Sequence, residues 1–171
     1  PSDVGEDCMI PLDIALQKKH TVHHKEAVAF DQGECDYRAE FWARVRMTAR
    51  NWRGTWLRSA LLNPFRYPGY AFSLWSHKIL RWLSPFFLIV PFLVSLPGLA
   101  HSVPQMVVGL YLLAGLGVCL GWLKENGLLR VKGPWGTLFS FTVANLGFLL
   151  GVWKAIRGKR IVTYSSNPSA D

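Results

Sequence analysis

The sequence predicts a mainly α-helical membrane protein whose first 40 residues have the character of an α/β domain. Half of the 171 residues are hydrophobic, which is too many for a disordered chain. Nine of the eleven acidic residues lie in residues 1 to 40, whereas three long apolar segments follow residue 78. This separation of acidic from apolar sequence predicts a water-exposed part first and a membrane part second.

Residues 1 to 40 predict one helix and one strand or strand pair. Residues 7 to 18 indicate a helix of about three turns, because apolar residues recur there and Pro11 stands near the start. The short segment 21 to 30 carries the β-branched Val22 and Val28, which is typical of a strand. So little sequence cannot bury a core of its own. We therefore expect the chain, which does not begin with Met, to be the C-terminal piece of a longer one.

Residues 41 to 82 form a basic and aromatic segment around which the rest of the chain is organised. They contain eight Lys or Arg residues among many aromatic rings, and no acidic residue. Cations together with amphipathic rings are typical of the boundary between water and an anionic lipid leaflet. From residue 37 to about 62 the pattern predicts a helix with a basic face. The alternative is a soluble helix with a solvated basic face, but the apolar segments that follow favour the membrane surface.

Three apolar segments each reach the roughly 20 residues needed to cross about 30 Å of hydrocarbon. They run from 79 to 96 or 100, from 103 to 123, and from 134 to 153. Lys and Arg flank the outer ends of the first two segments but are absent from the link 97 to 104, so we expect the N-terminal part to be cytoplasmic. A third span would place Lys154 and Arg157 on the opposite side, against this tendency. A re-entrant or interfacial hairpin over 134 to 153 is the alternative.

Several other classes of function fit the sequence poorly. The net charge of +8 belongs to the part rich in apolar segments, so a membrane surface explains the basic residues better than nucleic acid does. Cys8, Cys35 and Cys119 are odd in number and widely spaced, which predicts neither a disulfide framework nor a zinc site. His20, His23 and His24 lack a carboxylate to complete a ligand set, so we expect no metal site in this chain.

Four stretches, taken in order, resemble the membrane-bound family 2 glycosyltransferases, in which a GT-A catalytic domain precedes interface helices and transmembrane helices. They are Gly5-Glu6-Asp7 before an apolar helix, Glu26-Ala27-Val28-Ala29-Phe30, Ala43-Arg44-Val45-Arg46-Met47, and Leu62-Asn63-Pro64 through Ser76-His77-Lys78 to Trp82. The third stands where many members have Gln-Arg-x-Arg-Trp, with Ala43 in place of Gln and Met47 in place of Trp. These two departures weigh against processive polymer synthesis and are common among members that transfer sugars singly.

The resemblance implies a domain organisation and an activity. Residues 1–36 would be the remnant of the catalytic GT-A domain, 37–77 the amphipathic interface helices, 78–156 the transmembrane region and 157–171 a tail. The enzyme would transfer a sugar from a cytosolic nucleotide-sugar donor to a lipid-linked or glycan acceptor, as in polysaccharide biosynthesis. It would lie in the cell (inner) membrane as a multi-pass protein, in contact with membrane lipids and not with nucleic acid.

The resemblance also implies roles for particular residues. Asp7 would be the catalytic base that takes the proton of the acceptor hydroxyl, with Glu6 as a neighbour that positions it or caps the helix. Arg44, Arg46 and Met47 would bind substrate near the leaving diphosphate or the acceptor. The divalent cation of the full-length enzyme, Mg or Mn, is held in the family by an Asp-x-Asp motif that this sequence lacks. We therefore expect no cofactor in this chain and no turnover by it alone.

Two other functions fit the same residues. One is a noncatalytic small membrane protein, such as an assembly or transport subunit, with a basic interfacial helix. The other is a peripheral lipid-binding module with a hairpin anchor. Acidic residues in the first turn of a helix commonly do no more than complement its dipole, and arginines beside apolar segments commonly bind lipid headgroups. The sequence alone leaves these alternatives open.

Overall fold

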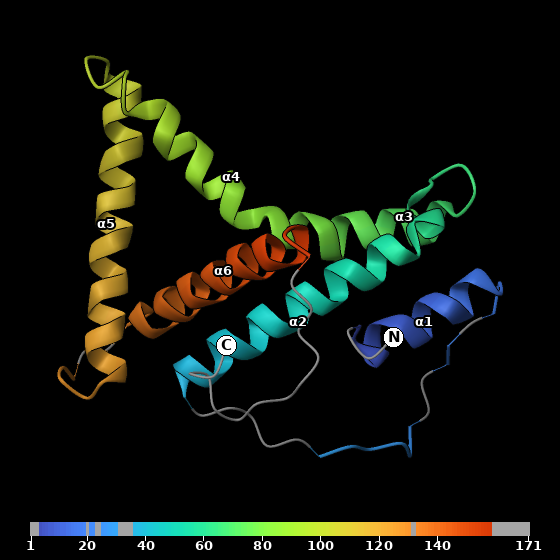
Figure 1. The fold of residues 1–171 in the computed structure, drawn as a ribbon. Helices are drawn as coiled ribbons and strands as arrows, with labels where there is room; N and C mark the ends of the chain where they lie inside the picture. Colours follow the sequence, from blue (N-terminus) through green and yellow to red (C-terminus); the bar gives the residue numbers. More distant parts are fainter. Residues whose placement is uncertain (1–3, 20, 23–24, 31–35, 131–132, 159–171) are drawn as a thin grey trace. The chain divides into compact units, whose positions relative to one another are not determined.

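The computed structural model describes residues 4–19, 21–22, 25–30, 36–130 and 133–158, and the regular elements among them are all helical (Figure 1). They are α1 (Glu6–Leu16), α2 (Tyr37–Leu57), a 3₁₀ turn (Ser59–Leu62), α3 (Pro68–Ser73), a π-helical turn (Leu74–Ile79), α4 (Leu80–Ser95), α5 (Ser102–Glu125) and α6 (Trp135–Ile156). The chain divides into two compact units. Pro1–Trp82 with Gly147–Asp171 forms the first unit, and Leu83–Leu146 forms the second.

The strand predicted over 21 to 30 is wrong for the residues of that stretch that the structure describes. They form a turn and irregular chain, and the side chains of Val22 and Phe30 are 89% and 97% exposed. A strand is stable only when it pairs with neighbours and buries one face, and these apolar side chains pack on nothing within the described chain. The α/β character expected for the first 40 residues is therefore not seen in these residues, and neither is a GT-A remnant.

In the first unit, α1 packs on α2. The buried face of α1 consists of residues spaced by three or four positions: Cys8, Leu12 and Ala15, preceded by Val4. Gly54 on α2 lets the two segments approach closely, since a Cβ added there would lie 2.8 Å from Val4 Cγ1. The predicted helix over 7 to 18 is confirmed, although it begins at Glu6 and so takes Pro11 beyond its first turn.

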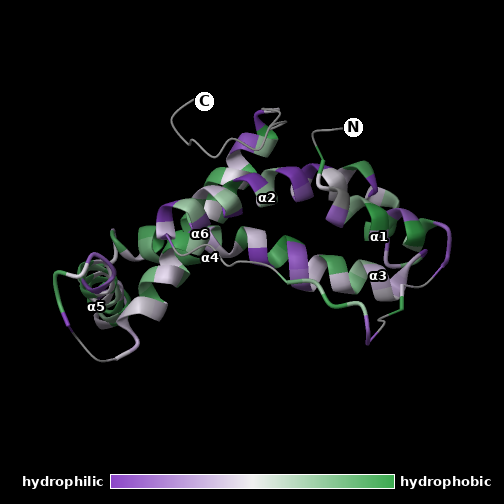
Figure 2. Ribbon diagram, turned by 90° about the horizontal axis from the view of Figure 1, so that it is seen from below, coloured by the Kyte–Doolittle hydropathy of each residue, from purple (hydrophilic) through white to green (hydrophobic). Residues whose placement is uncertain are grey.

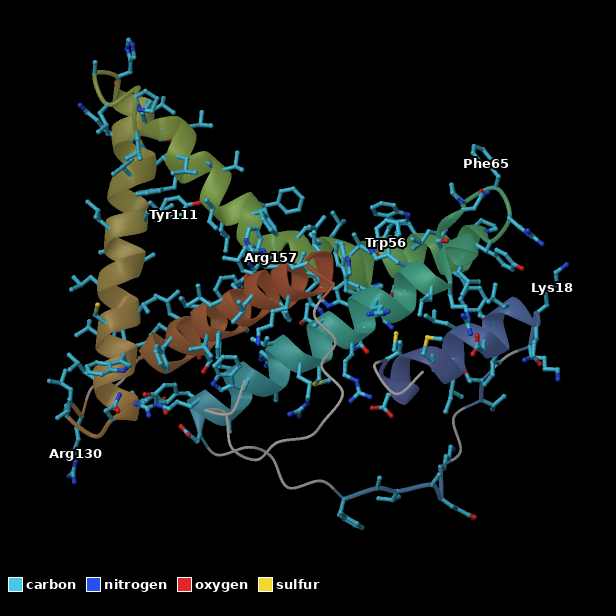
Figure 3. The ribbon with its side chains drawn as sticks, viewed as in Figure 1. Lys18, Trp56, Phe65, Tyr111, Arg130 and Arg157 are labelled. Atoms are coloured by element: carbon cyan, nitrogen blue, oxygen red, sulfur yellow. The ribbon has the colours of Figure 1, made fainter. Side chains whose placement is uncertain are left out.

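The first apolar helix is longer than the sequence indicated. Helix α3, the π-helical turn and α4 run without a break from Pro68 to Ser95, so the aromatic stretch before residue 79 belongs to the same helix as the apolar segment. The turn before it is closed by Asn63, whose side chain accepts a hydrogen bond of 2.9 Å from the backbone N–H of Phe65. Phe65 itself is 96% exposed and points away from the helices (Figure 3).

In the second unit, small residues and polar contacts join the helices. Gly117 and Gly121 of α5 receive the start of α6, where Trp135, Leu138 and Phe139 would meet any added Cβ. The hydroxyl of Tyr111 on α5 donates a 2.6 Å hydrogen bond to the carbonyl of Leu88 on α4 (Figure 3). Ser84 of α4 likewise donates a 2.6 Å bond to the side-chain oxygen of Asn145 on α6.

Three helices are long and apolar enough to cross a membrane: Pro68–Ser95, Ser102–Glu125 and Trp135–Ile156. The prediction of three such segments is confirmed, with ends that differ by a few residues except at the start of the first. Their outward side chains are mostly apolar, and Leu110, Leu112 and Leu113 of α5 are each about two-thirds exposed. Figure 2 shows hydrophilic residues recurring along α2. These features are consistent with a multi-pass membrane protein.

Candidate functional site

A small pocket in the first unit lies between the first turn of α1, the middle of α2 and the π-helical turn. Its volume is about 140 Å³. The lining residues are Gly5, Asp7, Cys8, Arg46, Met47, Arg50, Asn51 and Lys78. Three of them are cationic and one is acidic, so the pocket combines a carboxylate with an excess of positive charge.

The first turn of α1 supplies the carboxylate. Asp7 is exposed and lines the pocket, while Glu6 begins α1 and its side chain lies outside the described structure. The first turn reaches α2 because position 5 is glycine, where an added Cβ would lie 2.8 Å from the side-chain oxygen of Asn51. A larger residue at position 5 would therefore displace the side chain of Asn51 from its place in the pocket.

One face of α2 supplies the opposite wall. Arg46 and Arg50 are four residues apart, as are Met47 and Asn51, so each pair lies one turn apart on the same side of the helix. Arg50 Nη2 donates a 2.9 Å hydrogen bond to the carbonyl of Val4, which fixes the guanidinium at the start of α1. Arg50 Nε is buried without a hydrogen-bond partner, so this donor is left for a ligand or a water molecule.

Lys78 completes the pocket from the π-helical turn. Its Nζ lies 3.3 Å from the sulfur of the buried Cys8, which is only a weak hydrogen-bond acceptor. A lysine held mainly against a thiol keeps its positive charge available to an anion in the pocket. Residues of three separate segments thus converge on one small volume.

The structure brings together some of the predicted site residues and not others. Asp7, Arg46 and Met47 line the pocket, and Met47 is 56% exposed. Arg44 does not line it and instead forms an ion pair with Glu40 one turn earlier, with 2.6 Å between Arg44 Nη2 and Glu40 Oε1. The physical reason is helix geometry, because residues two apart point in nearly opposite directions. Arg44 and Arg46 therefore point to different sides of α2, and of the two only Arg46 lines this pocket.

Basic residues in and just after α2 form contacts with α1. Arg58, just after α2, forms a bidentate ion pair with Asp13 of α1, with one bond from Arg58 Nη2 to Asp13 Oδ2 of 3.1 Å. The hydrogen bond from Arg58 lowers the pKa of the Asp13 carboxyl, and the charge of Arg58 adds to this, while partial burial opposes it. The structure thus shows Arg50 and Arg58 bonded to the α1 segment.

The described residues hold no group of three or more His, Cys, Asp or Glu side chains that could bind a metal ion. They therefore do not provide the divalent cation site that the resemblance implies for the full-length enzyme, and we derive no step through such an ion. His20, His23 and His24, for which no metal role was expected, lie outside the described residues.

Sequence reasoning missed four residues of the pocket: Cys8, Arg50, Asn51 and Lys78. Arg50 and Asn51 could have been found from their four-residue spacing to Arg46 and Met47. Cys8 follows Asp7 directly but carries no signal of its own. Lys78 stood out only as a cation before an apolar segment, and nothing in the sequence indicates that it folds back over α1.

The fold and the pocket define a class: a helical protein with three helices long and apolar enough to cross a membrane, and with a basic pocket beside the first of them. Comparisons with protein-family models, with curated proteins and with solved structures found no match to this chain. Any narrower function must therefore be argued from the pocket itself.

Proposed function

We propose that this chain is the C-terminal part of a membrane glycosyltransferase that moves a sugar from a cytosolic nucleotide-sugar donor to a lipid-linked or glycan acceptor. The observation that carries the proposal is that Asp7 lines one pocket with Arg46 and Met47, although 39 positions separate Asp7 from Arg46 in the sequence. These are three of the residues to which the family resemblance assigns catalysis and substrate binding.

Asp7 would act as the general base. Its exposed carboxylate takes the proton of the acceptor hydroxyl while the hydroxyl oxygen attacks the anomeric carbon of the donor sugar. The bond from that carbon to the nucleoside diphosphate breaks, and the diphosphate leaves with the bonding electrons. One carboxylate beside an open pocket is sufficient for this proton transfer.

The cations would stabilise the phosphate charge. Arg46 and Arg50 present guanidinium groups on one face of α2, and Lys78 adds a third positive charge from another segment. Guanidinium groups bind phosphate oxygens in pairs and act strongly at a partly enclosed site. The unpartnered Nε of Arg50 supports this role, because a phosphate oxygen would satisfy that donor.

The size of the pocket limits what it can hold. Its volume of about 140 Å³ is well below the roughly 300–1,000 Å³ of typical small-molecule sites, so it accommodates a phosphate or the reacting end of an acceptor and not a whole nucleotide-sugar. In the proposal, the donor pocket and its divalent cation belong to other parts of the full-length enzyme.

The substitution Asp7→Asn in the full-length enzyme tests the proposal. It keeps the shape of the side chain but removes the base, so we expect sugar transfer in isolated membranes to be abolished while expression in the membrane is unchanged. Asp13→Asn is the matched control, because Asp13 lies on the same helix and pairs with Arg58 outside the pocket. Full transfer by the Asp7→Asn enzyme would remove Asp7 from the mechanism.

The small pocket also favours one rival, a noncatalytic membrane protein whose basic helix binds lipid phosphates. In that case the Asp7→Asn substitution would leave the function of the protein unchanged. Arg46→Glu would then lower membrane association, whereas the transferase proposal expects it to lower transfer much more than association. Measuring both quantities on the same variant separates the two functions.

A further inference from the structure

The part of α6 from Gly147 onward belongs to the first unit and packs on α2. A Cβ added at Gly151 would lie 2.6 Å from Thr48 Cβ and 2.9 Å from the carbonyl oxygen of Val45, so the two backbones are in close contact there. This contact places the last turn of α6 beside the first half of α2. Side chains from two segments far apart in the sequence can therefore form one surface.

Two cations at the end of α6 lie over tryptophan rings. The Nζ of Lys154 is 5.2 Å from the centre of the Trp42 ring on α2, and the guanidinium carbon of Arg157 is 4.2 Å from the centre of the Trp153 ring. The backbone N–H of Arg157 donates a 3.1 Å hydrogen bond to the carbonyl of Trp153, so the helical turn extends to Arg157. Lys154 and Arg157 are three residues apart and are therefore neighbours on the helix surface. We call these four residues the cation–tryptophan cluster.

The positive charge of the cluster is not neutralised from its own helix. The sequence has no acidic residue from 126 to 170. At the start of α2, the side chain of Asp36 accepts a 3.2 Å hydrogen bond from the backbone N–H of Arg38, and Glu40 forms its 2.6 Å ion pair with Arg44. Tryptophan rings attract cations but carry no net charge, so the cluster retains two positive charges.

The cluster is also exposed and bordered by apolar surface. Trp42 is 37% exposed, Trp153 is 52% exposed and the neighbouring Ile156 is 66% exposed. Tryptophan rings lie at headgroup depth in membranes, where the long side chains of Lys and Arg reach lipid phosphates. The C-terminus of a helix by itself favours cations, but this does not explain why Lys154 lies over a ring of a second helix.

We propose that the cation–tryptophan cluster binds the headgroup of an anionic phospholipid. Lys154 and Arg157 contact the phosphate, while the two rings and Ile156 lie against the start of the acyl chains. A lipid fits better than a water-soluble anion, because much of the site is exposed apolar surface on a helix apolar enough to enter a membrane. The site is independent of the proposed sugar transfer, and it is the same whether α6 crosses the bilayer or lies along it.

Lipid titration of the whole protein in detergent micelles, followed by native mass spectrometry, tests this site. Phosphatidylglycerol is the probe, and phosphatidylcholine, whose choline cancels the phosphate charge, is the reference. We expect the parent to bind phosphatidylglycerol more tightly. Lys154→Gln with Arg157→Gln should weaken that binding by about fivefold for each charge removed and leave phosphatidylcholine binding unchanged.

Lys18→Gln with Lys19→Gln is the matched control. It removes the same number of exposed charges just after α1, and Lys18 lies well away from Arg157 (Figure 3). This variant should bind phosphatidylglycerol as the parent does. Equal weakening in the two double variants would overturn the proposal. Lys154→Arg with Arg157→Lys keeps both charges and should retain the preference for phosphatidylglycerol.

Two measurements on the parent need no variant and remain decisive if a substitution prevents folding. Equal affinity of the parent for the two lipids would contradict the proposal. Glycerophosphoglycerol, which is the headgroup without acyl chains, should not displace the bound lipid at equal concentration, because it cannot cover the apolar surface. Displacement would instead assign the cluster to a water-soluble phosphate.

Discussion

Gly54 is the position at which a single added side chain should separate α1 from α2. A Cβ there would lie 2.8 Å from Val4 Cγ1, 3.2 Å from Met9 Sδ and 3.7 Å from Cys8 Sγ. Val4 is 2% exposed and Cys8 is 3% exposed, so neither side chain can swing into solvent to make room. The α1 segment as a whole must therefore move when position 54 is enlarged.

Two opposing effects decide the size of the change in stability. Replacing a helical Gly by Ala gains about 1 kcal/mol of helix propensity, whereas overpacking a tight contact costs about 1–3 kcal/mol. The Gly54→Ala variant can therefore come out close to the parent, and Gly54→Leu is the decisive substitution. Leu has almost the same propensity as Ala but adds three more carbon atoms to the same contact. We expect Gly54→Leu to lose about 2 kcal/mol of unfolding free energy.

Thermal unfolding in detergent measures the stability, and the reactivity of Cys8 measures the displacement of α1. With Cys35 and Cys119 replaced by Ser, Cys8 should react slowly with a thiol reagent in the parent and faster in Gly54→Leu. Gly69→Leu is the control, since no atom lies within 4 Å of a Cβ at Gly69. If Gly54→Leu unfolds at the same temperature as Gly69→Leu, and Cys8 reacts equally slowly in both variants, then α1 does not pack on α2 at this position.

Three further predictions concern the pocket and the helices around it. Arg58 lowers the pKa of Asp13 from its ordinary value of 3.8, so their ion pair should stabilise the folded protein fully above pH 3.8. This stabilisation should be lost as the pH falls through the lower pKa of Asp13 in the folded protein. The unfolding midpoint, measured against pH, should show the loss in the parent protein and not in Arg58→Gln. Under the proposed transferase function, Arg46→Glu in the full-length protein should lower the rate of sugar transfer by about 10²–10³-fold with little change in membrane association, as tested by transfer and flotation assays. A double-mutant cycle of Ser84→Ala and Asn145→Ala should give a coupling energy of about 0.6 kcal/mol, measured by unfolding in bicelles, and additive losses would mean that their hydrogen bond contributes nothing.

The long helices were predictable because their signals are local. Uninterrupted apolar sequence with turn residues at its ends set the limits of α5 and α6 within a few residues of those observed. The start of the first long helix was predicted eleven residues late, because its aromatic and basic beginning differs in composition from the apolar segment. No proline lies between Pro68 and Pro85, so the backbone continues across that change in composition.

The predicted strand failed because its signal was only a pair of β-branched residues. A strand depends on partners elsewhere in the chain, and Val28 is 66% exposed with no strand beside it among the described residues. The sequence of ten residues could not reveal whether such partners exist. Strand preference reflects packing on a sheet more than it reflects the backbone itself.

The pocket was only partly predictable, since it depends on contacts between distant segments. Asp7, Arg46 and Met47 were singled out together only by the resemblance to a family, and no periodicity links α1 to α2. The approach of α1 to α2 rests on Gly5 and Gly54, which read in the sequence as ordinary glycines. The two residues of the pocket on α2 that were missed, Arg50 and Asn51, follow from helical spacing once Arg46 is chosen.

The periodicity of α2 suggested two faces, one apolar and one basic, but the structure shows three surfaces: one contacts α1, one contacts α6 and one is exposed. Gly54 and the pocket residues meet α1 on one side, while Phe41, Val45 and Thr48 meet α6 about two-fifths of a turn away. The partly exposed rings of Trp42 and Trp56 remain for lipid. Because α2 contacts protein on two sides, some of its arginines bind within the protein. Arg50 of α2, and Arg58 just after it, bond to the α1 segment. The positive charge of α2 therefore overstates the number of guanidinium groups that are available to lipid phosphates.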